Sequence, residues 1–332
     1  MNYQNNQSKS VAIIGAGLSG LSCATRLQTL GYQVELFEKS RGPSGRMSTR
    51  HGDGWAADHG AQYFTARDPR FVQELDSWIS QNVAAVWSPD IKVYQEHHWR
   101  ESHSKENRYV GTPDMSSPGK YLAKNLSVQF NQTINAIQIE NGKWLLHSKE
   151  SGQLSQSFDV LILALPAPQV YALSREIHND VEGICKQANM KGCWTVMARF
   201  QEKPQVSFEA AFVNHELISW ISRNNSKPGR HGPESWTIHA NPDWSEQFIE
   251  LEKDKATALI IECAKKLGLD CQNAEISTHR WRFASGSSPE IPGFYHDPEI
   301  KFGLCGDWLH GGRVEGAWLS GYKLAMEIER TK

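Results

Sequence analysis

Short apolar runs and amphipathic stretches alternate at the start of the chain. Residues 10–14 form a β-branched apolar run, which is typical of a buried parallel strand. A stretch with apolar positions at helical spacing follows, at Leu21, Ala24 and Leu27. Residues 34–38 form a second apolar run, which ends in an acid. The pattern predicts a strand, a helix and a second strand, the repeating unit of a parallel sheet.

Later apolar runs predict further strands and a last helix. Residues 158–165 form a mostly apolar run that is closed by Pro166, and residues 300–305 form another. The stretch after residue 311 predicts a helix, with apolar positions at Leu319, Leu324 and Ile328.

The middle of the chain predicts antiparallel strands. Residues 128–139 and 144–147 flank Asn141-Gly142, which is a strong hairpin signal. The composition changes beyond residue 168, where the pattern predicts strands at 194–200, 217–221 and 235–239 and a helix at 248–267. We therefore expect an antiparallel sheet with helices in addition to the parallel sheet.

Six residues join the first predicted strand to its helix, in the order Gly15-Ala16-Gly17-Leu18-Ser19-Gly20. Gly15 permits a tight turn, Gly17 lets the backbone approach a pyrophosphate, and Gly20 lets the helix pack close to the sheet. The free N–H groups at the helix start attract phosphate. Glu38 ends the second strand and suits the ribose hydroxyls. The pattern predicts a dinucleotide site, and the alternative is a purely structural turn.

Composition narrows the class of protein. The 332 residues suffice for about two domains, and 35 basic against 37 acidic residues argue against general nucleic-acid binding. The first ten residues are polar, and no apolar run approaches the roughly 20 residues of a membrane span. We therefore expect a soluble cytoplasmic protein. The 12 tryptophans indicate either core packing or a pocket for a flat ligand.

The segment after Glu38 resembles the ExxxxxGGR continuation of FAD-binding proteins in the amine-oxidase superfamily. The resemblance implies that Lys39, Arg46 and Met47 contribute to the cofactor site, with the arginine at the pyrophosphate. Ser44 stands where the superfamily has its first glycine, and we expect the turn to survive because serine is small. Residues 58–64 resemble the D-x-G-A segment that lines the flavin, which implies cofactor contacts at Gly60, Ala61, Gln62 and Tyr63.

The C-terminal part resembles the second half of the same cofactor site. Gly306-Asp307 resembles the second FAD fingerprint, in which the acid bonds the ribityl chain. Ile134 falls where the superfamily's hairpin approaches the adenine. The block that opens the last helix implies charge stabilisation at the flavin, with Arg313, Val314, Glu315 and Ala317. We expect FAD to be bound non-covalently, because the sequence has no S-G-G-C block like that of covalent relatives.

Nearly the whole chain is similar to the renalase-type FAD-dependent oxidoreductases, particularly the bacterial ones. The segments that carry the resemblance are 39–42, 60–68, 223–228, 279–281, 305–308 and 312–321. The resemblance implies an α/β fold with an amine-oxidase/hydroxylase-like topology. It combines a Rossmann-like FAD-binding domain, built on a parallel sheet, with a smaller α+β substrate domain that has an antiparallel sheet. We place the discontinuous FAD-binding domain at 8–70, 118–168 and 293–332, and the substrate domain at 71–117 and 169–292.

The resemblance also implies a reaction. Renalase-type enzymes oxidise 2- or 6-dihydro isomers of NAD(P)H to NAD(P)+, and pass the electrons through FAD to O2 to give H2O2. A dihydropyridine ring donates hydride readily, so the enzyme mainly has to hold the ring against flavin N5. Flavin-dependent amine oxidation or a desaturase-like reaction is the alternative. A non-catalytic FAD-binding protein is a second alternative.

Aromatic side chains are the first candidates for substrate contact. We expect walls of the substrate site among Trp281, Tyr63, Trp194 and Trp220, and core packing is the competing interpretation of each. Arg313 stands where monoamine-oxidase relatives carry a cage tyrosine, and a guanidinium there would repel a cationic amine. The alternative is that Arg313 pairs with Glu315 or Asp307.

Polar side chains of the predicted substrate domain form a second set of candidates. Asn224, Arg223 and His239 suit the carboxamide or ribose of the substrate, and His239 is equally consistent with a core histidine. Lys227 and Arg230 suit the phosphates, with a solvated face as the alternative. We predict no metal site, because neither the six cysteines nor the surface histidines have metal-ligand spacing, the latter being His97, His98 and His103.

Overall fold

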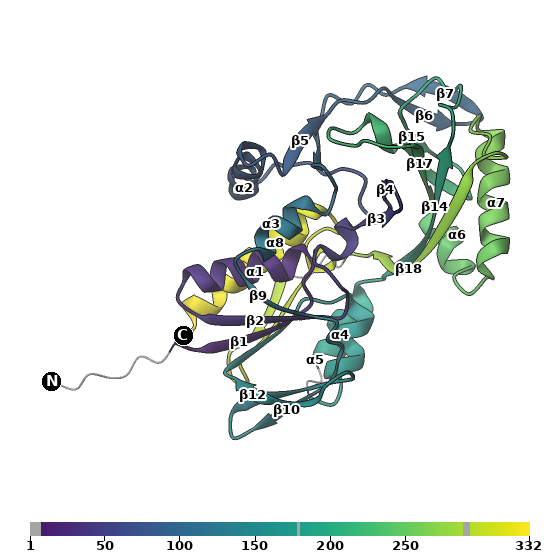
Figure 1. The fold of residues 1–332 in the computed structure, drawn as a ribbon. Helices are drawn as coiled ribbons and strands as arrows, with labels where there is room; N and C mark the ends of the chain where they lie inside the picture. The colour runs from purple at the N-terminus through teal and green to yellow at the C-terminus, as the bar shows by residue number, and fades with distance from the viewer. Residues whose placement is uncertain (1–7, 178–179, 288–292) are drawn as a thin grey trace. The chain divides into compact units, whose positions relative to one another are not determined.

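The structure, a computed structural model, describes residues 8–177, 180–287 and 293–332 (Figure 1). The chain forms two compact units. Unit 1 comprises Met1–Gly45, Gly119–Met190 and Gly286–Lys332, and unit 2 comprises Arg46–Pro118 and Lys191–Ser285. The first and last described segments of the chain therefore both belong to unit 1. None of the helices in the described ranges is long and apolar enough to cross a membrane.

Unit 1 is built on a six-stranded sheet with the order β19-β20-β13-β1-β2-β9. Its strands are β1 (Ser10–Ile14), β2 (Gln33–Glu38), β9 (Ser127–Phe130), β13 (Val160–Leu163), β19 (Phe294–Asp297) and β20 (Phe302–Cys305). All pairs are parallel except β19 with β20. The central strands β13 and β20 are buried along their whole length, which explains their unbroken apolar character.

Two long helices of unit 1 come from opposite ends of the chain and pack together, α1 (Leu18–Thr29) and α8 (Val314–Arg330) (Figure 1). The Ser22 hydroxyl donates to the Trp318 carbonyl at 2.8 Å, and a Cβ on Gly321 would clash with the Ser19 carbonyl oxygen. Unit 1 also contains an antiparallel sheet of β10 (Ile134–Glu140), β11 (Lys143–Ser148) and β12 (Gly152–Phe158), and the helices α4 (Ala167–Ser174) and α5 (Asp180–Gln187).

Unit 2 is built on a seven-stranded sheet with the order β18-β14-β17-β16-β15-β6-β7. Its strands are β6 (Ile91–Gln95), β7 (His98–Glu101), β14 (Lys191–Phe200), β15 (Ala210–Val213), β16 (Ile218–Arg223), β17 (Glu234–Ala240) and β18 (Glu275–Ser285). Only β15 and β6 pair in parallel. Helices α6 (Pro242–Gln247) and α7 (Lys253–Lys266) belong to this unit, and the core between sheet and helices contains Trp194, Trp236 and Ile260.

Two small antiparallel strand pairs complete unit 2. They are β3 (Thr49–Gly52) with β4 (Trp55–Asp58), and β5 (Ala84–Trp87) with β8 (Arg108–Gly111). Helix α2 (Pro69–Ser80) precedes β5, and α3 (Ser117–Ala123) follows β8 and contains the point in the sequence where unit 2 ends and unit 1 resumes. Short 3₁₀ turns lie at Gly45–Met47, Asn224–Ser226 and, in unit 1, Asp307–Leu309.

The predicted α/β class, with one parallel and one antiparallel sheet, is confirmed, but several predicted elements have different bounds, and three of them show why. The run 128–139 is two strands in different sheets, because Asn131 adopts a left-handed conformation (φ +55°) and turns the chain between β9 and β10. The predicted strand 158–165 is shorter, since Phe158 ends β12 before β13 starts. The predicted helix 248–267 starts at Lys253, since Glu252 is extended.

The two units also divide the chain differently from the predicted domains. Residues 46–70 belong to unit 2, where Asn224 and Thr237 hydrogen-bond the backbone of β4. Residues 169–190 belong to unit 1, because Val170, Val181 and Ala188 pack into the core of that unit. Apolar pattern alone does not show which core a segment joins.

Gly321→Ala is expected to lower the free energy of unfolding by about 1–3 kcal/mol, because the added Cβ forces α1 and α8 apart. Thermal unfolding followed by circular dichroism measures this as a lower Tm. Gly183→Ala in α5 is the matched control, since a Cβ there meets nothing within 4 Å, and its Tm should stay level or rise slightly. Equal losses in both variants would contradict the close packing of the two helices.

Candidate functional site

The glycine-rich turn of unit 1 lies between β1 and α1. Gly15 has a positive φ of +106°, and a Cβ on Gly20 would clash with the carbonyl oxygen of Gly15. Both positions therefore require glycine, which has no Cβ. The two glycines bring the start of α1 directly onto the end of β1.

The start of α1 fits the phosphate end of a dinucleotide. Gly17 is the N-cap of α1 and offers no side-chain cap, and the first turn contains no acid. A Cβ on Gly17 would meet nothing within 4 Å, so the protein leaves space there. Among the described residues, the buried hydroxyl of Ser19 has no hydrogen-bond partner. Uncapped N–H groups and an unpaired hydroxyl beside open space are what an incoming phosphate needs.

Glu38 organises the turn from the end of β2. Its buried carboxylate accepts hydrogen bonds from the amides of Ala16, at 2.9 Å, and Ser40, at 2.8 Å. Each carboxylate oxygen keeps a further acceptor position, so a ribose hydroxyl can still bind there. Lys39 is exposed beside it, and Ile134 is buried at the start of β10.

Ser44 confirms the expectation that the turn forms without glycine. Its amide donates to the carbonyl of Ala16 at 2.9 Å, and its φ is +94°. Serine thus holds a conformation that glycine adopts more easily. The next predicted cofactor residues belong to unit 2, where Arg46 donates to the carbonyl of Ala284 at 3.1 Å and Met47 is buried.

The C-terminal candidates of unit 1 lie at the end of β20 and the start of α8. Gly306 donates its amide to the Ser320 hydroxyl at 2.9 Å, and the buried Asp307 follows. Arg313 is the exposed N-cap of α8, whose first residues are Val314, Glu315, Gly316 and Ala317. Gly15 and Gly306 follow β1 and β20, and Glu38 is the last residue of β2. Because these strands are parallel, all three residues lie at the carboxyl edge of the sheet, where open α/β sheets bind ligands.

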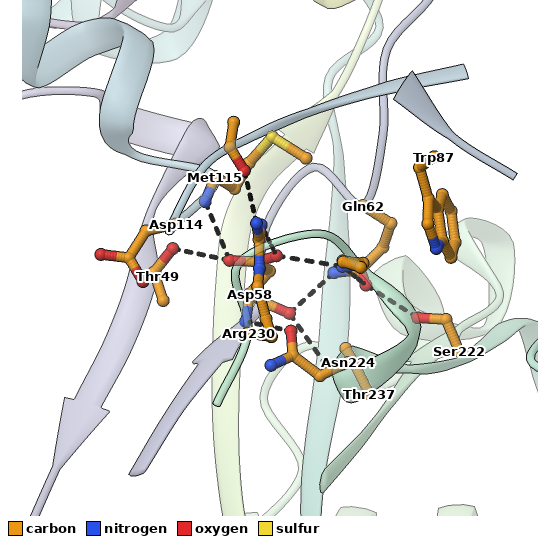
Figure 2. Close-up of polar contacts among 12 residues, drawn as sticks. Thr49, Asp58, Gln62, Trp87, Asp114, Met115, Ser222, Asn224, Arg230 and Thr237 are labelled. Carbon is orange, nitrogen blue, oxygen red and sulfur yellow. Dashed lines mark hydrogen bonds and ion pairs between the residues drawn. The ribbon is translucent and has the colours of Figure 1, made fainter. Parts of the chain in front are cut away.

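Asp58 is the centre of a buried ion cluster in unit 2 (Figure 2). Its carboxylate is fully buried and accepts hydrogen bonds from Thr49 Oγ1 at 2.7 Å and the Met115 amide at 3.1 Å. Lys227 Nζ lies 3.1 Å and Arg230 Nη2 lies 2.6 Å from the same carboxylate oxygen. Two cations therefore share one carboxylate.

The ionisation of this cluster follows from its burial and its charges. Burial acts to raise the pKa of Asp58, but Lys227 and Arg230, with hydrogen bonds from Thr49 and Arg230, hold it well below the ordinary value. Burial lowers the pKa of Lys227 to about 8, against the attraction of Asp58. The carboxylate is therefore charged at neutral pH.

The cluster extends to the predicted flavin segment through Gln62. The Gln62 amide donates to the carbonyls of Asp58, at 2.8 Å, and Gly60, at 3.0 Å, and its oxygen accepts from Lys227 and from Ser222. The backbone of Gly60 and Ala61 is held as well, since Ala61 donates its amide to the Arg46 carbonyl at 2.9 Å. The Gln62 side chain is thus fully occupied within the protein, and fixes the shape of this segment.

Several predicted substrate contacts have other roles in the structure. Asn224 is buried, and its amide donates to the Ala56 carbonyl and accepts from the Asp58 amide, so it holds β4. Arg223 pairs with Glu234 at 2.8 Å. Trp194 lies in the hydrophobic core of unit 2, and its indole N–H donates a hydrogen bond to the Phe248 carbonyl.

The alternative that Lys227 and Arg230 lie on a solvated face was wrong. Both residues are buried inside unit 2, where their side chains form ion pairs with Asp58. Asp58 itself is absent from the predicted site residues. The D-x-G-A resemblance that begins at Asp58 was the signal that could have found it.

Trp281 forms a cluster with two histidines of unit 2, His59 and His279. Its indole N–H donates to the His59 carbonyl at 2.9 Å, and its ring stacks on that of His59 at 5.1 Å. The His279 ring meets Trp281 edge-on at 4.4 Å, and Arg50 Nη2 lies 3.2 Å from His279 Nδ1. Within the described residues, the buried atoms His59 Nδ1 and His239 Nε2 have no hydrogen-bond partner.

Burial keeps these histidines neutral. It lowers the pKa of His59 to about 3, with help from His279 and Arg50, and the pKa values of His239 and His279 to about 4. At pH 7 the imidazoles donate and accept hydrogen bonds without carrying charge. They suit the binding of a neutral polar group.

Tyr63 is half-buried among aromatic rings of unit 2. Its ring lies 5.5 Å from Trp220 and 6.2 Å from Trp87. By contrast, His97, His98 and His103 are exposed, and no group of ligands suited to a metal ion occurs in the part of the chain that the structure describes.

The glycine-rich turn on the parallel sheet of unit 1 and the mostly antiparallel sheet of unit 2 agree with the fold class of FAD-dependent oxidoreductases. Residues 13–77 match the NAD(P)-binding Rossmann-like domain, and residues 76–329 match the flavin containing amine oxidoreductase family. The second match spans most of the chain, so the chain belongs to the flavin containing amine oxidoreductase family. FAD as the cofactor and the predicted superfamily are thereby confirmed.

Individual relatives agree with this family. Renalase from Mus musculus is 26% identical over 299 residues, which cover 84% of this chain and 85% of that protein. Cyclohexylamine oxidase from Brevibacterium oxydans IH-35A has a TM-score of 0.76 at 13% identity, covering 97% of this chain and 99% of that one. A protein from Exiguobacterium sp. 255-15 has a TM-score of 0.80 at 12% identity, and the match covers 98% of this chain and 100% of that one. These two structures show the shared fold.

Asp58→Asn is expected to lower the free energy of unfolding at pH 7 by about 3–5 kcal/mol, because it leaves Lys227 and Arg230 buried without a carboxylate. Urea unfolding followed by tryptophan fluorescence measures the change. Glu275→Gln is the control, since it removes an exposed partner of Arg199 and should cost less than about 1 kcal/mol. A loss no larger than that of the control would rule out the central role of Asp58.

The same cluster predicts a loss of stability in acid. The pKa of Asp58 is lower in the folded protein than in the unfolded chain, where it is near 3.8, so the unfolded chain binds the proton first. The free energy that Asp58 contributes to the stability of the fold is present above about pH 3.8. It is lost as the pH falls below that value. Urea unfolding at a series of pH values should show a shallower acid slope for Asp58→Asn than for the wild type, and parallel slopes would contradict this.

Proposed function

We propose that this protein is an FAD-dependent oxidase that takes hydride from a 2- or 6-dihydro isomer of NAD(P)H and releases NAD(P)+. Bound FAD would supply the hydride acceptor at its N5 atom, and O2 would take up the two electrons with two protons and leave as H2O2. The similarity to renalase carries the proposal, because it extends over 84% of this chain and 85% of that protein.

Unit 1 supplies the cofactor residues in this proposal. The bound FAD provides the hydride acceptor. The uncapped amides of Leu18, Ser19 and Gly20 bind its pyrophosphate, since α1 has no side-chain cap. Glu38 binds the ribose and Asp307 the ribityl chain. The N-terminus of α8 stabilises negative charge with the help of Arg313.

Unit 2 supplies the substrate residues in this proposal. The hydrogen bond from Trp281 to the His59 carbonyl fixes the indole, which offers a flat face to the dihydronicotinamide ring. His239 Nε2, which has no partner among the described residues, binds the carboxamide. Because the imidazoles are neutral at pH 7, they orient the ring without moving a proton, and hydride donation from this ring needs no base. Asn224 acts as a positioning residue through the Asp58 backbone.

Amine oxidation is the competing function. The solved amine oxidases that share the fold are 12–13% identical to this chain, and a shared fold at that level leaves the reaction open. No acid within the described ranges pairs with the exposed guanidinium of Arg313. An unpaired positive charge disfavours a protonated amine.

Anaerobic mixing with separated substrates tests the proposal. We expect the 2- or 6-dihydro isomer of NAD(P)H to bleach the flavin absorbance, because its ring donates hydride directly. NADH is the matched control, since it differs only in the position of the hydride, and it should leave the flavin oxidised. Bleaching by putrescine or cyclohexylamine instead would establish amine oxidation. An FAD-loaded protein that none of these donors bleaches would refute any such oxidase activity.

The flavin is expected to come free of the chain in acid. Cys305 precedes the second fingerprint in sequence, but it is fully buried inside β20, where it is unsuited to a covalent bond with FAD. After acid precipitation of the holoprotein, the absorbance spectrum should place the flavin in the supernatant. Flavin retained in the washed pellet would show a covalent link.

A further inference from the structure

The interior of unit 2 carries a surplus of positive charge. Among the described residues of this unit, the buried charged side chains are three cations, Arg108, Lys227 and Arg230, and one carboxylate, Asp58. Lys227 and Arg230 both bind Asp58. Burying a charge is costly unless an opposite charge compensates it. Arg108 is the cation that Asp58 does not compensate.

Arg108 has little else within the protein to stabilise its charge. It is 8% exposed, and its side chain makes one hydrogen bond, from Nη1 to the Glu106 carbonyl at 3.3 Å. The Glu106 carboxylate pairs with Arg67 instead. In the described ranges, no acid pairs with Arg108, and its buried Nε has no hydrogen-bond partner.

Arg108 belongs to an aromatic group that we call the Tyr63 cluster, which consists of Tyr63, Trp87, Arg108 and Trp220. Arg108 lies opposite Trp87 in the register of β8 and β5, and its Cζ lies 5.4 Å from the centre of the Tyr63 ring. The rings of Trp87 and Trp220 both contact that of Tyr63. Trp220 is also buried, and no described residue accepts a hydrogen bond from its indole N–H.

The Tyr63 cluster thus has a buried cation and unpaired donors but contains no carboxylate. The face of an aromatic ring stabilises a guanidinium only weakly compared with an oxyanion. Tyr63 is half-buried, so the cluster is reachable from solvent at this ring. A guanidinium is the side chain best matched to phosphate oxygens, which accept two parallel hydrogen bonds from it.

We propose that the Tyr63 cluster is an oxyanion subsite that binds a phosphate group of the substrate, with Arg108 as its main ligand. The inference rests on the proposed function, under which the substrate is a dihydronicotinamide dinucleotide. Under this proposal Arg108 is a specificity residue. The reacting ring is the same in all dihydronicotinamide substrates, and Arg108 distinguishes those that carry a phosphate from those that do not.

Arg108→Gln tests the subsite with two substrates that share the reacting ring. They are the dihydronicotinamide mononucleotide, which has one phosphate, and the corresponding riboside, which has none. We expect the KM for the mononucleotide to rise about 10- to 100-fold, as for the loss of a charge-assisted hydrogen bond, while the riboside keeps its KM and kcat is unchanged for both. Equal effects on the two substrates would mean that Arg108 is merely structural.

Arg199→Gln is the matched control variant. Arg199 also lies over an aromatic ring, 4.4 Å from the centre of Trp55, but its guanidinium is paired with Glu275. Its replacement should leave both KM values at the wild-type level. Arg108→Lys keeps the charge without the planar fork and should restore part of the mononucleotide affinity, provided that its Tm matches the wild type.

Binding of inorganic pyrophosphate to the FAD-loaded protein tests the subsite without turnover. We expect a saturable change in tryptophan fluorescence for the wild type and Arg199→Gln, and none for Arg108→Gln, because Trp87 and Trp220 belong to the cluster. Pyrophosphate binding that is unchanged in Arg108→Gln would refute the subsite. If the protein oxidises no dihydronicotinamide, the proposed function fails, and this titration still decides whether the oxyanion subsite exists.

Discussion

The buried carboxylate of Asp58 is the interaction on which unit 2 depends. It accepts hydrogen bonds from β3, from the chain after β8 and from two cations in the segment after β16. A buried ion cluster is stable only while every partner is in place, since each unpaired member carries a large desolvation cost. One side chain therefore fixes the β3–β4 hairpin, the segment 224–230 and, through Gln62, the segment that resembles a flavin-lining loop.

Three histidines and a tryptophan form the uncharged part of the candidate site in unit 2. Burial keeps His59, His239 and His279 uncharged, and a hydrogen bond fixes the Trp281 ring. The remaining charge in the interior of unit 2 is a positive surplus. An environment of this kind orients a flat, neutral ring and favours an anionic substituent, which agrees with hydride transfer from a nucleotide and disagrees with the binding of a cationic amine.

The sequence by itself determined most of unit 1. The strand, turn, helix and strand at its start depend on burial periodicity and on glycines that close backbone contacts require, and both are properties of neighbouring residues. The last helix and the hairpin at Asn141-Gly142 were predictable for the same reason. The prediction failed at 128–139, because a single left-handed residue, Asn131, divides an apolar run that otherwise looks continuous.

Only the tertiary structure decided the electrostatics of unit 2. Lys227 and Arg230 look like surface cations in the sequence, yet they are buried because Asp58 lies beside them, 169 and 172 residues earlier in the chain. Arg108 belongs to no motif and to no periodic pattern in the sequence. Its candidate role in binding an oxyanion becomes visible only in the structure, where no described acid pairs with it. Periodicity shows which face of an element is buried, whereas the partner across the core depends on how distant segments fold together. For that reason the sequence determined the fold class and cofactor, and the structure decided the charges around the candidate substrate residues.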